Sequence, residues 1–289
     1  MNSRIRSYET RLEKNNMLPF YIYKIECRQN TIGIYAHWHE ELEILYVNCR
    51  GIVEIEGTPI HFKENDIIFI NKDQLHMVNA LSDGLIYAIV FDYSFLDFNS
   101  SDFSQIHIIE NLKNKKIFFP AIISNAENEY EMIKNYLFEM VNQYNGNIPG
   151  KELKIKCNIY EILFLLYSTN KLSKKAEINI HDINQLSYVK ETILHMENDY
   201  NSQLTIDELA KKVSISKFHL IKIFKQITGV TPIIYLRDLR IEKSVKYLNE
   251  GHSVTQTAYM CGFNNLSYFI RTFRERFKVS PKEFQKSTM

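Results

Sequence analysis

The sequence lacks the features that mark disulfide-stapled or membrane-spanning proteins. Its 289 residues include only four cysteines, which show no CxxC spacing, so a reduced, cytosolic setting is the simplest interpretation. No apolar run approaches the roughly 18 residues needed to cross a bilayer, and residues 1–16 have no apolar core of the kind a signal peptide carries. With 45% hydrophobic and 24% charged residues, we expect a cytoplasmic globular protein with no membrane contact, long enough for two domains.

The chain also lacks a strong excess of charge of either sign. The formal net charge is +1, which alone says nothing about nucleic acid. The distribution is uneven, because residues 181–289 hold 16 Lys and Arg against 11 Asp and Glu. A mildly acidic front half is therefore joined to a basic back half.

Residues 20–95 consist of short β-branched or aromatic segments separated by turn residues, which is typical of strands. These segments are FYIYKIE, TIGIYA, LEILYV, IVEIEG, DIIFIN and LIYAIVF. Many short strands at this spacing predict a sandwich or a small barrel. Residues 126–145 and 151–170 then switch to helical periodicity, and the breaker NGNIPG separates them.

From residue 187 onward the pattern is helical, with clear start and stop signals. Thr-x-x-Glu at 205–208, Ser-x-x-Gln at 253–256 and Ser-x-x-Glu at 280–283 each fit a capping box. Thr231 precedes Pro232 as a hydroxyl cap before a first-turn proline, and Gly229 stands where the preceding helix needs a left-handed residue. We place a front domain at 1–170, a linker at 171–186 and a helical domain at 187–289.

One helix ending occurs twice in the helical domain, 49 residues apart. The stretches LIKIFKQITGVTP (220–232) and FIRTFRERFKVSP (269–281) agree in apolar, basic and proline positions. Each follows a shorter helix with a small contact residue and a tight turn, which is typical of a helix-turn-helix. The contact and turn residues are Ala210 and Ser214 in the first copy, and Ala258 and Gly262 in the second.

We assign the first helix-turn-helix to 205–229 and the second to 253–278, whose turn is expected to be one residue longer. The helix between them, 232–250, is about 27–29 Å long at 1.5 Å per residue. A rod of that length can hold two recognition helices about one DNA turn, roughly 34 Å, apart. Two copies therefore predict that one chain binds double-stranded DNA in two successive major grooves.

Residues 187–286 resemble the DNA-binding domain of the AraC/XylS family of bacterial transcription regulators. The stretches that carry the resemblance are LAKKVSISKFHLIKIFKQITGVTPIIYLRDLRIEKSVKYL and AYMCGFNNLSYFIRTFRERFKVSPKEF. Two positions depart from the family pattern. Ser244 stands where the linker helix usually has alanine, and Lys278 stands where glycine is usual and is expected to strain its turn.

The resemblance implies which residues contact DNA. The family's base-facing positions fall on Phe218, Ile221, Lys222, Leu266, Ser267 and Arg271. Residues expected to contact the DNA backbone are Ser216, Lys217, Lys225, Arg240 and Asn264. Phe218 and Ile221 suit thymine methyl groups, while Lys222 and Arg271 suit guanine or phosphate.

The front domain contains a second cluster of chemically active residues, His37, His39, Glu43 and His76. On a single strand the first three would share parity and point to one face. The pattern resembles the metal motif of cupins, whose ligands suit iron, manganese or zinc, but the Pro-x-Gly that normally precedes the last histidine is replaced by NKDQLH. The barrel of AraC-like regulators often binds a small effector without metal. We favour an effector pocket with no metal or other cofactor; a metal site and merely hydrogen-bonded histidines remain the alternatives.

These features predict a two-domain α+β chain: an N-terminal cupin-like β-barrel (jelly roll) with a C-terminal helical pair, then an all-α DNA-binding domain with two helix-turn-helix motifs. We expect a ligand-responsive transcription regulator and not an enzyme, an activator responding to a sugar or another small metabolite, with RNA polymerase as a further partner. The helices at 126–170 either pair two subunits, as in similar regulators, or pack on the chain's own barrel. The rival hypotheses are a metal-dependent cupin enzyme, a metal-sensing regulator and a constitutive DNA-binding protein with a structural barrel.

Overall fold

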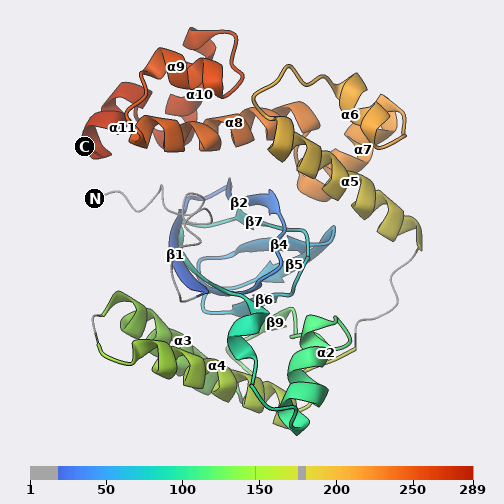
Figure 1. The fold of residues 1–289 in the computed structure, drawn as a ribbon, viewed down its shortest axis with the longest axis vertical. Coiled ribbons are helices and arrows are strands. Elements are labelled where there is room, and N and C mark those ends of the chain that lie inside the picture. The colour runs from blue at the N-terminus through green and yellow to red at the C-terminus, as the bar shows by residue number, and fades with distance from the viewer. Residues whose placement is uncertain (1–18, 147, 175–179, 289) are drawn as a thin grey trace. The chain divides into compact units, whose positions relative to one another are not determined.

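The computed structural model describes residues 19–146, 148–174 and 180–288 (Figure 1). The described residues divide into two compact units, residues 19–146 with 148–174 and residues 180–288. Helix α5 (Ile180–Asp199) takes up the last seven residues of the predicted linker, while residues 175–179, like residues 1–18, lie outside the described part. Among the helices that are described, none is long and apolar enough to cross a membrane.

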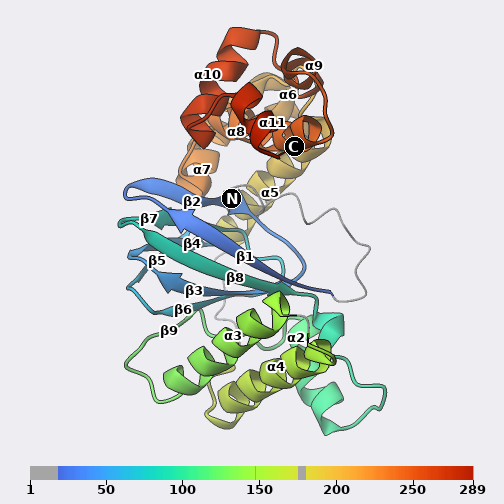
Figure 2. The same cartoon turned by 90° about the vertical axis from the view of Figure 1, so that its left-hand side faces the viewer.

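The front unit is a sandwich of two antiparallel sheets (Figure 2). One sheet has the order β1-β8-β3-β6-β9 and the other β2-β7-β4-β5. The strands are β1 (Phe20–Cys27), β2 (Thr31–His37), β3 (Leu42–Asn48), β4 (Gly51–Ile55), β5 (Thr58–Phe62), β6 (Ile67–Ile70), β7 (His76–Ala80), β8 (Gly84–Phe91) and β9 (Ile122–Ile123). This sheet-rich architecture agrees with the predicted cupin-like fold.

Strands β5, β7 and β9 have no counterpart among the predicted segments. Strand β5 forms a hairpin with β4 through Glu56 and Gly57, whose φ values of 53° and 80° fit a two-residue type I′ turn. Strand β4 therefore ends at Ile55, before the Glu56–Gly57 pair that the prediction had included. Pro59 is tolerated in β5 because that strand lies at the edge of its sheet.

The core of the front unit has two layers, and β3 contributes to both. Leu45 lies between the two sheets, whereas Leu42 and Ile44 belong to the layer between the five-stranded sheet and the helices, as expected for alternating side chains. Glu43 shares the parity of Leu45 and therefore points between the sheets. A buried carboxylate in this position needs polar partners.

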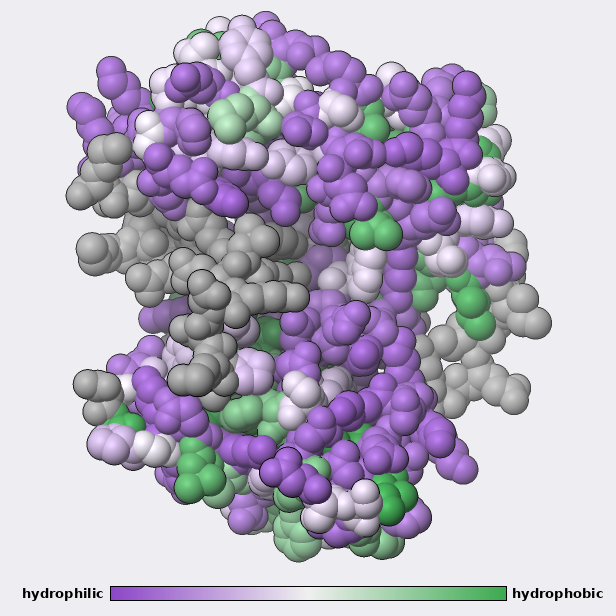
Figure 3. All heavy atoms as spheres, in the orientation of Figure 1, coloured by the Kyte–Doolittle hydropathy of each residue, from purple (hydrophilic) through white to green (hydrophobic). Residues whose placement is uncertain are grey.

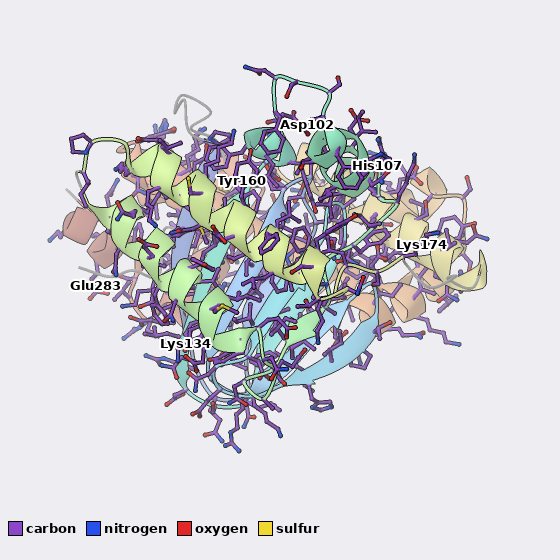
Figure 4. The ribbon with its side chains drawn as sticks, turned by 90° about the horizontal axis from the view of Figure 1, so that it is seen from below. Asp102, His107, Lys134, Tyr160, Lys174 and Glu283 are labelled. Carbon is purple, nitrogen blue, oxygen red and sulfur yellow. The ribbon has the colours of Figure 1, made fainter. Side chains whose placement is uncertain are left out.

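Helices α3 (Tyr130–Asn145) and α4 (Lys151–Ser168) cover the outer face of the five-stranded sheet (Figures 2 and 4). Tyr160 of α4, labelled in Figure 4, donates a hydrogen bond of 2.9 Å to the carbonyl of Leu96. Leu96 ends η3 (Tyr93–Leu96), and η4 (Gln105–Ile109) with α2 (Glu110–Lys113) follow. The helical pair thus packs on the chain's own sheet, one of the two arrangements that the sequence left open.

The described residues of the back unit form helices joined by short loops and turns. After α5 come α6 (Ile206–Lys212), α7 (Lys217–Thr228), α8 (Pro232–Asn249), α9 (Val254–Met260), α10 (Leu266–Phe277) and α11 (Pro281–Thr288). The turn between α9 and α10 occupies 261–265, one residue more than the turn at 213–216 between α6 and α7, as predicted. The 18 residues of α8 correspond to a rod of about 27 Å.

Most of the predicted helix signals are confirmed. Thr205 and Ser253 each form a reciprocal capping box with the residue three positions later, and Ser280 exchanges the same two bonds with Glu283. Thr231 is the N-cap residue of α8, but its hydroxyl makes no capping hydrogen bond, so that part of the prediction was wrong. Gly229 adopts the expected left-handed conformation, with φ of 73°.

Most of the surface seen in Figure 3 is hydrophilic, with hydrophobic residues in small separate groups. Among the described large apolar side chains, the most exposed are Phe218, Leu153 and Phe164, at 76%, 68% and 64%. Phe218 lies on α7 and the other two on α4. Exposed apolar side chains of this size make both helix faces candidates for contact with other molecules.

Candidate nucleic-acid interface and effector site

Helix α7 buries one side and leaves a mixed aromatic and basic side exposed. Its buried residues include Leu220, Ile223, Phe224 and Ile227. The exposed side carries the predicted contact residues Phe218, Lys222 and Lys225, with Ile221 half-buried beside them. Ser216 begins the helix, since its hydroxyl accepts a hydrogen bond from the backbone N–H of His219.

Lys217, predicted to contact the DNA backbone, is already engaged within the first helix-turn-helix. Its ammonium lies 3.3 Å from a carboxylate oxygen of Asp207 and 5.8 Å from the ring centre of Phe218. Both contacts are solvent-exposed, so a phosphate could replace them at little cost. The predicted role of Lys217 therefore stays open.

Helix α10 has the same design, with one side buried and the other exposed. Phe269, Thr272 and Phe273 are buried, while Ser267 and Arg271 are exposed. The guanidinium of Arg271 lies 5.4 Å from the ring centre of Tyr268. Leu266 is half-buried and packs against the core of the second helix-turn-helix, so only part of its side chain faces outward.

Two predicted phosphate contacts are occupied inside the protein. The Arg240 guanidinium donates hydrogen bonds of 2.7 Å to the carbonyls of Tyr200 and Ser202, and Asn264 exchanges two amide hydrogen bonds with Gln203, at 2.9 and 3.0 Å. Because two of its nitrogens donate to backbone carbonyls and burial lowers its pKa, Arg240 is better explained as a structural residue than as a phosphate ligand. Asn264 is exposed but has the same kind of internal partner.

The sequence analysis missed two exposed side chains on α10. Tyr268 occupies the first turn and is 39% exposed, and Arg274 lies one turn beyond Arg271 on the exposed side. The 49-residue offset of the repeat aligns Arg274 with Lys225, so the repeat itself could have identified it. Tyr268 aligns with His219, which does not share its character, and no sequence signal pointed to it.

In the front unit, the four predicted side chains converge. One nitrogen of each of the three histidines and one oxygen of Glu43 lie within 4.8 Å of one another, and the four residues are only 1–9% exposed. The convergence is confirmed, but the strand-parity reason was wrong. His37 ends β2, His39 lies in the following loop, Glu43 is in β3 of the opposite sheet, and His76 begins β7.

Backbone carbonyls orient all three imidazoles. Nδ1 of His37 lies 2.8 Å from the carbonyl of Tyr35, Nδ1 of His39 lies 3.0 Å from that of Glu41, and Nδ1 of His76 lies 2.9 Å from that of Gln74. A carbonyl oxygen can only accept, so each Nδ1 must carry the proton. Each neutral imidazole then has a lone pair on Nε2, which is the arrangement found in metal-binding histidines.

Glu43 brings an anion to these nitrogens. Its Oε2 lies 3.1 Å from Nε2 of His39 and 2.9 Å from Nε2 of His76. Burial raises the pKa of Glu43, but contacts with His39 and His76 outweigh burial and hold that pKa well below its usual range. Burial also lowers the pKa of His76, which disfavours its imidazolium form, and its Nε2 has no hydrogen bond of acceptable geometry.

The cluster therefore favours a positive charge between the carboxylate and the imidazoles. Two acceptors about 3 Å apart repel each other unless a proton or a cation lies between them. Three imidazoles and one carboxylate suit a divalent first-row transition metal. Metal–ligand bonds of about 2.0–2.2 Å put neighbouring ligand atoms roughly 3–3.5 Å apart. The four candidate atoms lie within 4.8 Å of one another, so the residues fit a metal with only small movement.

Comparison with known proteins agrees with this organisation. Residues 19–163 match the AraC-like ligand binding domain, and residues 209–287 match a helix-turn-helix domain. Over 265 residues the chain is 33% identical to the HTH-type transcriptional activator RhaS of Salmonella arizonae, covering 90% of this chain and 91% of that protein. The chain belongs to the AraC family of transcriptional regulators.

Other proteins are similar over most of the chain. The uncharacterized HTH-type transcriptional regulator YdeC of Bacillus subtilis is 25% identical over 273 residues, covering 93% of this chain and 92% of its own. The solved structure of ToxT from Vibrio cholerae covers 92% of this chain and 98% of its own, at 18% identity and a TM-score of 0.46. As an AraC-family regulator the chain binds DNA and has a domain for a small effector; it is not an enzyme.

Proposed function

We propose that this regulator reads two successive major grooves with the exposed faces of α7 and α10. The observation that carries the proposal is the equivalent placement of Lys222 and Arg271, both exposed and 49 residues apart in two copies of the same motif. Phe218 and Ile221 would meet thymine methyl groups in one groove, while Ser267 and Arg271 would meet base edges in the other. Ser216, Lys217 and Lys225 would hold the DNA backbone.

Lys222→Ala and Arg271→Ala test this proposal in the full-length protein. Each should lower the affinity for the cognate promoter by about 1–3 kcal/mol, because each removes a charged donor to a base or phosphate. Lys24→Ala, an equal change of charge at an exposed position of β1 in the front unit, is the matched control. Titration by fluorescence anisotropy gives the three affinities. If Lys222→Ala binds as tightly as the control, α7 is not part of the interface, and the same result for Arg271→Ala would exclude α10.

We further propose that the cluster of His37, His39, Glu43 and His76 is where the front unit senses a small organic effector such as a sugar. Its support is the burial of four polar side chains in one place between the sheets. Effector binding would shift the regulator between two populations with different activity at the promoter. The RhaS relatives are named activators, which supports activation, with RNA polymerase as the partner, over repression.

A metal-sensing regulator is the second candidate, and the carbonyl-bound Nδ1 atoms favour it. In that case His37, His39 and His76 would offer Nε2 atoms and Glu43 an oxygen, and the ion would supply the positive charge that the cluster favours. The experiment compares wild type with Glu43→Gln, and uses Glu40→Gln, an exposed carboxylate of the adjoining loop, as control.

Plasma mass spectrometry of the purified protein and a reporter assay separate the two candidates. An organic effector predicts a response lost in Glu43→Gln, no bound metal and no effect of a chelator. A metal sensor predicts a stoichiometric metal that Glu43→Gln loses, together with a chelator that abolishes the wild-type response. If Glu43→Gln and His39→Ala both keep the full response, the cluster has no role in sensing.

We also propose that α4 pairs two copies of the chain. Leu153, Cys157 and Phe164 are exposed on one face of this helix, since positions i, i+4 and i+11 lie close together around it.

The other three cysteines are buried, so a short bis-maleimide should cross-link the protein through Cys157 alone. The expected covalent dimer should vanish in Cys157→Ser, and Phe164→Asp should shift sedimentation to a monomer; a wild type that sediments as a monomer at all concentrations would contradict the pairing.

A further inference from the structure

The loop between α5 and α6 leads into the first helix-turn-helix but contacts the second. Tyr200 begins this loop and packs against the core built by α8, α9, α10 and α11. Its hydroxyl lies 3.0 Å from the hydroxyl of Tyr247 on α8, and the ammonium of Lys243 lies 5.9 Å from the centre of its ring. A side chain that precedes the first copy is thus packed on the core of the second copy.

Arg240 attaches the same loop to the linker helix. It projects from the middle of α8 and its guanidinium donates to the carbonyls of Tyr200 and Ser202, at 2.7 Å each. Charge-assisted hydrogen bonds of this kind are stronger than neutral ones. The backbone of the loop is therefore held at two points by a helix that the chain reaches only thirty residues later.

The turn of the second helix-turn-helix closes the contact from the other side. A Cβ atom on Gly262 would lie 2.9 Å from the carbonyl oxygens of both Tyr200 and Asn201, so the turn backbone approaches the loop directly. Two residues further on, Asn264 exchanges two amide hydrogen bonds with Gln203. Gln203 lies just before α6, and Asn264 just before α10.

We propose that these contacts form a clamp that fixes the separation of α7 and α10, and so determines which spacing between two half-sites the regulator accepts. The clamp consists of Tyr200, Gln203, Arg240, Gly262 and Asn264. With α8 as the sole connection, bending of one helix would let the two copies adapt to several spacings. The contacts between the α5–α6 loop and the turn before α10 form a second connection, which removes that freedom. The inference rests on the proposed two-groove reading and gives Gln203 and Asn264 a positioning role.

The geometry of DNA makes such a clamp selective. Inserting one base pair between two half-sites moves the second by about 3.4 Å along the axis and turns it by about 35° around it. A rigid pair of recognition helices cannot follow both changes without losing contacts. Weakening the clamp should therefore improve binding to displaced sites relative to the native site.

The test uses the full-length protein and an operator that the wild type selects from random duplex DNA. Affinities are measured for the native spacing and for spacings one base pair longer and shorter. In Gln203→Ala and in Asn264→Ala, the preference for the native spacing should fall about two- to tenfold. The double variant should fall no further, because both changes break the same contact, and the exchange Gln203→Asn with Asn264→Gln should restore the preference.

Three results would overturn the clamp. An unchanged spacing preference in both single variants contradicts it directly. Equal weakening at all spacings by Asn264→Ala, with no effect of Gln203→Ala, would make Asn264 a phosphate contact instead. A wild-type operator with only one half-site would overturn the two-groove reading along with the clamp, and this failure is recognised before any variant is made.

Discussion

The two helix-turn-helix copies share a scaffold and differ in what they expose. Both begin their recognition helix with a side chain that caps a backbone N–H, Ser216 in one and Asn265 in the other. The exposed first turn carries Phe218 in α7 and Ser267 in α10. The interior is therefore repeated while the outer face has diverged, as expected if the two copies read different bases.

The copies also differ where the backbone is left-handed. The turn residues Ser214 and Gly262 both have positive φ, 57° and 79°, and the recognition helices end at Gly229 and Lys278 with φ of 73° and 64°. Each copy thus has one glycine and one ordinary residue in this conformation, in opposite order. The glycine of the second copy lies in the turn because the loop carbonyls of Tyr200 and Asn201 leave no room for Cβ.

The largest effect on folding should come from Gly262→Ala. An alanine at this position must keep a positive φ, which costs about 1–2 kcal/mol, and its Cβ must displace two carbonyl oxygens. We therefore expect a loss of about 3 kcal/mol in the free energy of unfolding. Ser214→Ala is the matched control and should change it by less than about 0.5 kcal/mol, since Ser214 already has a Cβ. Urea denaturation of the full chain measures both; equal losses would show that the two turns are equivalent.

Gly229→Ala should cost about 1–2 kcal/mol, because it introduces the left-handed penalty at a φ of 73°. The same denaturation curves measure it. A loss as large as that of Gly262→Ala would mean that Gly229 also meets neighbouring backbone.

The smallest effect should be a gain. Lys278→Gly relieves the left-handed conformation of a lysine and should stabilise the back unit by about 0.5–1 kcal/mol, after the higher chain entropy of glycine is allowed for. A shift of the urea midpoint to higher concentration would confirm it, and the slope of the transition should not change. Destabilisation would show that the lysine side chain contributes more than its backbone conformation costs.

Local signals predicted most of the helical unit. Capping boxes, the proline start of α8 and the two copies of one motif could be read directly, because their partners are three or four residues apart. The sandwich was also predictable, yet β7 was missed because His76–Ala80 is buried on both faces and shows no alternation. The polar residues after Ile180 suggested a linker, since composition alone does not separate a polar helix from a loop.

The contacts of the candidate sites were harder to predict because they join distant residues. Arg240 meets carbonyls 38 and 40 positions away, and Asn264 meets Gln203 across 61 positions. Without those partners, both side chains looked free to bind phosphate. In the front unit His37 and Glu43 were grouped correctly although they lie on opposite sheets, because the loop carrying His39 brings the two strand ends together.

Missing-base footprinting with the full-length regulator tests the two-groove reading most directly, since it reports which bases the complex needs. We predict two clusters of required bases, centred about one helical turn, roughly 10 base pairs, apart. Lys222→Ala should remove the requirement at one cluster and Arg271→Ala at the other, each leaving its neighbour intact. A single cluster in the wild type, or the loss of the same cluster in both variants, would contradict the account.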